Sequence, residues 1–112
     1  MAKEADVIVE SFRPGVTKKL GIDYETVNKI NPGIIYCSIS GYGAEDPRSK
    51  KAQHDLNMQA TSGYLSVNHG GTSPLHLCDL SSGMVAGQAI LAALYAREQT
   101  GKGTYIDTSM FD

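Results

Sequence analysis

Apolar residues occur along the chain in short continuous runs, separated by Gly, Pro and polar residues. Val7–Val9 and Ile34–Ile39 are rich in β-branched side chains and do not alternate between apolar and polar positions. Such runs are typical of strands covered on both faces, as in a parallel sheet. A further strand is expected from Tyr105 onward. The pattern therefore predicts an α/β fold built on parallel strands.

Helices are expected between these runs. Asp23 is a good N-cap for a short helix that Asn31-Pro32-Gly33 ends. A second helix is predicted from Asp55 to Ser62. The strongest pattern predicts a long helix from about Ser82 to Gln99, stopped by Gly101. Its many small residues predict close packing against another backbone.

The chain is expected to be part of a larger domain. Its 112 residues allow one small domain, yet a strand is predicted close to each end. A parallel sheet needs cover on both faces and neighbours at its edges. We therefore interpret residues 1–112 as a partial domain, truncated at both ends.

Charge and hydropathy narrow the class of partner. The formal net charge of −2 gives no global reason to bind nucleic acid or an anionic membrane. The longest apolar stretch, within Met84–Ala96, is expected to be too short and too interrupted to span a bilayer. The start of the chain lacks the apolar core of a signal peptide. These features predict a cytoplasmic protein with no membrane or nucleic-acid partner.

Asp79 is the first candidate for chemistry because it is expected directly before the long helix. A carboxylate there faces the free N–H groups of the first turn. In the structural interpretation, Asp79 or Ser81 is simply the N-cap. In the functional interpretation, the same N–H groups stabilise an oxyanion or enolate beside the Asp79 carboxylate.

Histidine and cysteine give one further candidate. His54 opens the predicted helix at Asp55, and it is either an ordinary helix-start residue or a general acid/base. His69 and His76 lack a supporting constellation and are interpreted as structural. Two isolated cysteines lie in apolar surroundings without the spacing of a metal motif, so no metal site is predicted: Cys37 and Cys78.

Three cations follow the first predicted strand: Arg13, Lys18 and Lys19. They are either part of a solvated face or phosphate contacts at the carboxyl end of a parallel strand, where α/β folds bind ligands.

Several segments, taken together and in order, resemble one family. The segments Ala5–Gly15 and Asn31–Gly43 are similar to consecutive strands and turns of the class III CoA-transferase and α-methylacyl-CoA racemase (CaiB/BaiF-type) family. His54-Asp55-Leu56-Asn57 resembles a segment of its racemase branch. Asp79–Gly83 resembles the segment with the active-site Asp, and Gly101–Asp107 resembles the stretch after the long helix.

The resemblance implies a Rossmann-like segment from the large domain of an interlocked homodimer that processes acyl-CoA. By the same resemblance, the catalytic residues are Asp79 and His54, with no metal. Coenzyme A contacts are implied for Ser11, Phe12, Arg13 and Lys19. Ser11 departs from the family pattern, which has Asn at this position.

Two chemistries remain open for such a site. In a CoA-transferase, Asp79 attacks the thioester and forms covalent intermediates. In a racemase, Asp79 and His54 exchange the α-proton on opposite faces of the carbon. His54 favours the racemase, because a transferase has no evident use for an imidazole there. A third alternative is an inactive fragment or a CoA-binding module.

Overall fold

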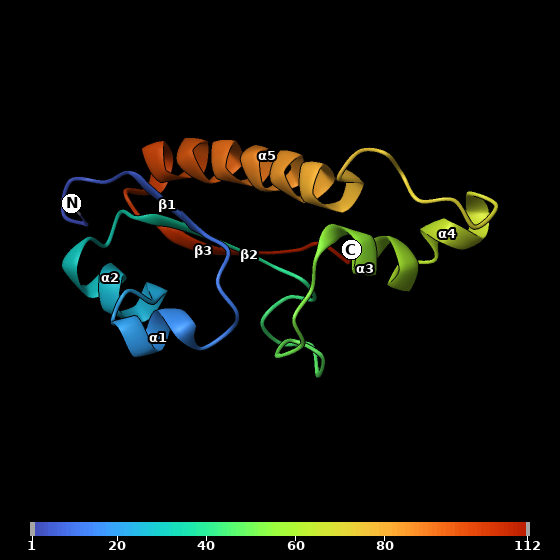
Figure 1. Cartoon of the computed structure of the whole chain (residues 1–112). Helices are drawn as coiled ribbons and strands as arrows, with labels where there is room; N and C mark the ends of the chain where they lie inside the picture. Colours follow the sequence, from blue (N-terminus) through green and yellow to red (C-terminus); the bar gives the residue numbers. More distant parts are fainter. Residues whose placement is uncertain (1, 112) are drawn as a thin grey trace.

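A three-stranded parallel sheet forms the centre of the protein. The computed structural model describes residues 2–111. The strands are β1 (Val7–Glu10), β2 (Ile35–Ser40) and β3 (Thr104–Ser109), in the order β1-β2-β3. Val7 pairs with Ile35, and Ile35 pairs with Thr104, so the three strands begin at one level (Figure 1). The predicted α/β fold with a parallel sheet is confirmed.

The central strand β2 is covered on both faces. Ile35 and Cys37 point to one face and Tyr36 to the other, since side chains alternate along a strand; all three are at most 1% exposed. This burial explains the continuous apolar run in the sequence. Figure 1 shows the long helix on one side of the sheet and the two N-terminal helices on the other.

Within residues 2–111, five helices connect and cover the strands. They are α1 (Val16–Leu20), α2 (Tyr24–Ile30), α3 (Asp55–Thr61), α4 (Tyr64–Val67) and α5 (Leu77–Thr100). Asp23 caps α2 as predicted, because its carboxylate accepts hydrogen bonds from the N–H and the hydroxyl of Thr26. Gly101 ends α5 in a left-handed conformation with φ 68°, which confirms the predicted stop.

The long helix differs from the prediction at its start and in its packing. α5 begins at Leu77 rather than near Ser82, so Asp79 lies within the first turn. Ser82 and Ala86 are buried, whereas a Cβ on Gly83 or Gly87 would meet nothing within 4 Å. The expected close approach to another backbone is therefore absent at these two glycines within residues 2–111.

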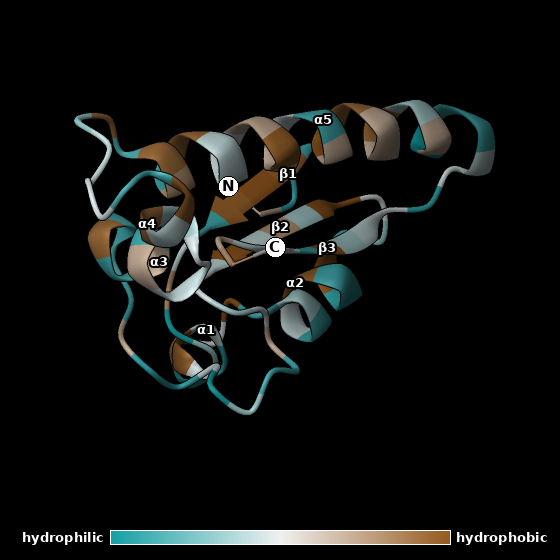
Figure 2. Ribbon diagram, turned by 90° about the vertical axis from the view of Figure 1, so that its right-hand side faces the viewer, coloured by the Kyte–Doolittle hydropathy of each residue, from teal (hydrophilic) through white to brown (hydrophobic). Residues whose placement is uncertain are grey.

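The length of α5 also corrects the expectation about apolar stretches. At 24 residues, it is long and apolar enough to cross a membrane by length and composition alone. Here it packs along β2 and β3. Hydrophobic positions recur along the α5 ribbon (Figure 2). Several large hydrophobic side chains of α5 are exposed, among them Leu80, Met84, Val85, Leu91 and Tyr95.

Candidate active site

A cavity of about 420 Å³ joins the segments that the sequence analysis singled out. The loop after β1 contributes Ser11, Phe12 and Arg13, the start of α3 contributes His54, and α5 contributes Asp79. Lys19 does not line it. The structure thus brings the two predicted catalytic residues together with three of the predicted CoA contacts, and the roles of all of them stay predictions.

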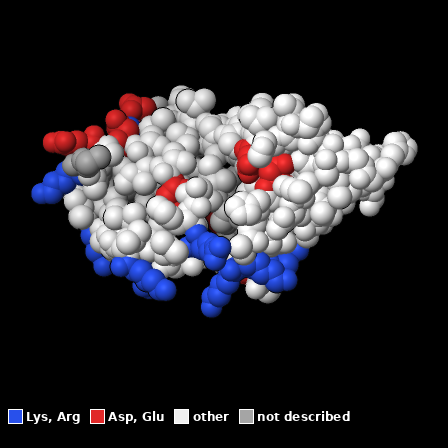
Figure 3. Space-filling view, viewed as in Figure 1, with Lys and Arg blue, Asp and Glu red and all other residues white. Residues whose placement is uncertain are grey.

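Basic side chains surround this part of the molecule. Lys and Arg gather along the lower edge in Figure 3, the side on which α1 and the loop before α3 lie in Figure 1. Lys51 lines the 420 Å³ cavity. A second cavity of about 400 Å³ is lined by Phe12, by two cations (Arg13 and Lys18), by three tyrosines and by three carboxylates: Glu10, Asp23 and Glu25. The 420 Å³ cavity is lined by two cations, Arg13 after β1 and Lys51 before α3, and, among the described residues, by one carboxylate, that of Asp79. An anionic ligand could therefore meet cations from two segments.

The loop after β1 is shaped by its own hydrogen bonds. The N–H of Phe12 donates to Glu10 Oε2 at 2.7 Å, and the N–H of Val16 donates to the Arg13 carbonyl at 3.1 Å. Gly15, with φ 88°, then starts α1 in a conformation that favours glycine. Phe12 is left 47% exposed, which makes its ring available to a flat ligand.

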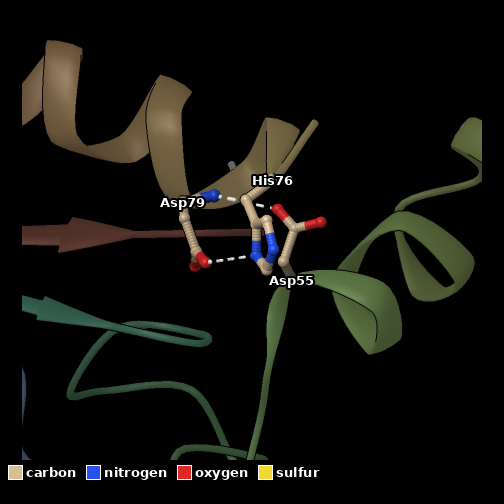
Figure 4. Close-up of side chains that lie close together, drawn as sticks. All are labelled: Asp55, His76 and Asp79. Carbon is tan, nitrogen blue, oxygen red and sulfur yellow. Dashed lines mark hydrogen bonds and ion pairs between the residues drawn. The ribbon is translucent and has the colours of Figure 1, made fainter. Parts of the chain in front are cut away.

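Asp79 offers a reachable carboxylate. Its side chain is 52% exposed, and its Oδ2 lies 3.3 Å from Nδ1 of His76 (Figure 4). His76 is the N-cap residue of α5, although its side chain makes no cap hydrogen bond. From the sequence, His76 was expected to be structural, because no residue pattern linked it to Asp79.

The first turn of α5 is capped from another helix. Asp55 Oδ1 accepts the N–H of Cys78 at 2.6 Å and the N–H of Asp79 at 3.1 Å. The proposal that Asp79 or Ser81 is the N-cap is therefore wrong. Ser81 instead donates its hydroxyl to the Cys78 carbonyl. Sequence reasoning named Asp55 only as part of the segment around His54, since nothing local reveals a cap from 24 positions away.

The same contacts correct the expected oxyanion site. The first-turn N–H groups of Cys78 and Asp79 already donate to Asp55, and that of Leu77 donates to the Leu75 carbonyl. The N–H of Leu80 donates within the helix to the His76 carbonyl. These groups are therefore not free to hold an enolate or oxyanion beside Asp79.

Asp55, His76 and Asp79 also offer ligand atoms within 4.8 Å of one another. A metal ion would have to compete for Asp55, whose Oδ1 has both lone pairs engaged. The arrangement is better described as a helix cap beside an accessible carboxylate.

Arg48 fixes the loop that forms one wall of the cavity. Its guanidinium carbon lies 4.1 Å from the ring centroid of Tyr42 and 4.4 Å from that of Phe111. It also forms two hydrogen bonds with the carboxylate of Asp46, at 2.9 and 2.8 Å. The hydrogen bonds from Arg48 lower the pKa of Asp46 to about 2.

The structure is thus an α/β segment with a parallel sheet, and the exposed carboxylate of Asp79 lies in its 420 Å³ cavity. The family model for CoA-transferase family III matches residues 1–112, and the chain belongs to this family. The resemblance inferred from the sequence is confirmed.

Individual relatives include both transferases and a racemase. The chain is 46% identical to an acetyl-CoA:oxalate CoA-transferase of Acetobacter aceti, covering 100% of this chain and 30% of that protein. It is 38% identical to an alpha-methylacyl-CoA racemase of Mus musculus, covering 100% of this chain and 31% of that protein. The crystal structure of a CAIB/BAIF family protein from Brucella suis superimposes with a TM-score of 0.94 at 36% identity, covering 99% of this chain and 31% of that one. The chain thus spans about a third of the relatives it matches.

Proposed function

We propose that the full-length protein is a CoA-transferase that moves CoA between carboxylic acids, with Asp79 as the nucleophile. The observation that carries the proposal is the 52% exposed Asp79 carboxylate in one cavity with Ser11, Phe12 and Arg13. Membership of CoA-transferase family III and the 46% identity to an acetyl-CoA:oxalate CoA-transferase support it. The family resemblance supports a homodimer as part of the same proposal, and a cytoplasmic location stays a prediction from the sequence.

The proposed reaction alternates between anhydride and thioester. A carboxylate oxygen of Asp79 attacks the thioester carbonyl, CoA leaves as thiolate, and a mixed anhydride forms. The thiolate then attacks the Asp79 carbonyl, which releases the donor acid and leaves an aspartyl-CoA thioester. The carboxylate of the acceptor acid attacks this thioester, and the thiolate attacks the acceptor carbonyl of the second anhydride. The new acyl-CoA departs, and the Asp79 carboxylate is restored.

Racemisation of an α-methylacyl-CoA is the second candidate. His54 lines the cavity together with Asp79, as a two-base mechanism requires. The sequence analysis favoured this chemistry on His54 alone. We place it second because the 46% identical relative is a transferase, whereas the racemase is 38% identical.

One set of variants of the full-length protein separates the two. Acetyl-CoA with oxalate is the transfer probe, and a 2-methylacyl-CoA in deuterated water is the racemisation probe. The proposal expects Asp79→Asn to abolish transfer, His54→Ala to retain most of it, and hydroxylamine to trap an adduct on Asp79.

Deuterium entering the α-position, with loss of racemisation in either variant and no trapped adduct, would establish the second candidate instead. General-base losses of about 10²–10⁴-fold set the scale for each residue in that case.

A further inference from the structure

Asp55 lies between the two residues proposed to do the chemistry. It is the first residue of α3, immediately after His54, and only 6% exposed. Its carboxylate reaches the start of α5 and meets the backbone of Asp79 itself (Figure 4). The buried Asp55 side chain therefore connects the start of α3, next to His54, to the turn of α5 that carries Asp79.

The carboxylate is held on both oxygens. Oδ1 accepts the two N–H groups of Cys78 and Asp79, and Oδ2 accepts the side-chain amide of Gln59 at 2.5 Å. Gln59 is 1% exposed, and its Oε1 accepts the N–H of Ser73 at 2.8 Å. The loop before α5 is therefore tied to the same two side chains.

These bonds suit an ionised group. Burial opposes ionisation of Asp55. The hydrogen bonds from the Asp79 N–H, the Gln59 amide and the Cys78 N–H nevertheless bring the pKa of its carboxyl below the usual 3.8. An ionised acceptor makes stronger hydrogen bonds to N–H groups than a neutral one, and a negative charge at a helix N-terminus is favoured.

We propose that Asp55 is a positioning residue, which holds the first turn of α5 so that the Asp79 carboxylate keeps its place in the cavity that His54 also lines. The inference rests on the proposed role of Asp79. Both oxygens of the Asp55 carboxylate accept hydrogen bonds from the protein, so the role proposed for it acts through Asp79. Its effect should appear in the turnover rate rather than in substrate binding, since a displacement of about 1 Å can cost about 10²-fold in rate.

The test uses Asp55→Ala and Asp55→Asn in the full-length protein, with acetyl-CoA and oxalate. Asn keeps a carbonyl oxygen for the two N–H groups but presents an amide to Gln59. We expect kcat to fall about 10- to 100-fold in Asp55→Ala and less in Asp55→Asn. KM for acetyl-CoA should stay within about twofold in both.

Arg97→Ala is the matched control for simple loss of stability. Arg97 ties the other end of the same helix, donating to the Gly33 carbonyl and to Asp6. It lies about 27 Å from Asp79 along the axis, at about 1.5 Å per residue. This variant should unfold at a lower temperature yet keep the wild-type kcat where it is folded.

The outcomes are distinct. Wild-type kcat in both Asp55 variants, or an equal loss in Arg97→Ala, overturns the inference. If Asp55→Ala does not fold, Asp55→Asn is used alone: a wild-type kcat in this variant, or a loss of kcat no larger than in Arg97→Ala, overturns the inference. If Asp79→Asn keeps full activity, or the wild type transfers nothing while racemising a 2-methylacyl-CoA, the proposed transferase function fails instead.

Discussion

Arg97 Nη2 donates a 2.8 Å hydrogen bond to the carboxylate of Asp6, 91 positions earlier in the chain. Its Nη1 donates to the Gly33 carbonyl at 3.0 Å. Through this one guanidinium, the last turn of α5 is joined to the residue before β1 and to the turn before β2. Different hydrogen bonds therefore hold the two ends of α5. Asp55 accepts those at the start of the helix, and Arg97 donates those at its end.

The two partners of this contact should differ in their effect on stability. The Arg97 side chain is 19% exposed and that of Asp6 is 75% exposed. Arg97→Ala also leaves the Gly33 carbonyl without its donor, so we expect a loss of about 1–3 kcal/mol in the free energy of unfolding. Asp6→Ala should cost less than about 1 kcal/mol, because exposed ion pairs contribute little. Urea denaturation of both variants measures the difference, and equal losses would contradict it.

The capping role of Asp55 predicts a pH dependence. Its pKa is lowered in the folded protein relative to 3.8, so the unfolded chain takes up this proton at a higher pH than the native one. The stabilisation is therefore complete above the unfolded pKa and is lost as the pH falls through the folded pKa. Asn at this position does not titrate.

We accordingly expect the stability difference between wild type and Asp55→Asn to be constant from about pH 7 to pH 5 and to shrink below about pH 4. Thermal unfolding across this range measures it. If the stability difference between wild type and Asp55→Asn instead grows toward low pH, the pKa of Asp55 is not lowered in the folded protein.

Gly103 should tolerate no side chain. A Cβ there would collide with the carbonyl oxygen of Ile34 and lie 2.6 Å from the carbonyl carbon of Gly33. Both are backbone atoms directly before β2, so β2 and β3 would have to separate to make room for the Cβ. We therefore expect Gly103→Ala to lower the free energy of unfolding by about 3 kcal/mol or more. Gly87→Ala is the control. Its Cβ meets open space, and in a helix the change should stabilise by about 0.5–1 kcal/mol.

The Arg48 contacts predict how the cavity wall responds to substitution. Lys at position 48 keeps the charge but loses the planar group that lies over Tyr42 and Phe111. Such cation–π contacts contribute about 0.5–2 kcal/mol to stability. If this contribution is lost from the loop, amide hydrogen exchange in residues 42–53 should accelerate about 2- to 30-fold in Arg48→Lys. Exchange in α2, which packs in a separate apolar cluster with Ile34 and Tyr36, should not change. Unaltered exchange in the loop would show that its order has another source.

The cations near the loop after β1 should contribute unequally to CoA binding. Arg13 lines both cavities and Lys18 lines one of them, whereas Lys19 lines neither. A phosphate-contacting cation contributes about 1–3 kcal/mol. Calorimetry on the full-length protein should therefore show weaker CoA binding for Arg13→Ala and Lys18→Ala than for Lys19→Ala. If CoA affinity is unchanged in both Arg13→Ala and Lys19→Ala, the CoA contacts predicted from the sequence are wrong.

Sequence reasoning succeeded where the determining contacts are local. The cap at Asp23 and the stop at Gly101 depend on neighbouring residues, and both were predicted. The strand β2 was predicted as well, because its own continuous apolar run marks it even though distant elements bury it. The start of α5 was placed near Ser82 because its cap is Asp55, 24 positions from Asp79.

The site was predicted in part for the same reason. Asp79 and His54 were named from segments that resemble a family, and the structure brings them to one cavity. The contact of His76 with Asp79 and the cavity position of Lys51 depend on tertiary geometry, which no residue pattern in a single sequence reveals.

The two contacts that hold the ends of α5 join residues at very different sequence separations, and this difference affects the order in which the protein can fold. The Asp55 contact closes a loop of 24 positions, whereas the Arg97 contact closes one of 91. Since closure entropy grows with the logarithm of loop length, the shorter loop costs about 1 kcal/mol less. The turn that carries Asp79 can therefore dock against α3 before the last turn of α5 has met the segment that precedes β1.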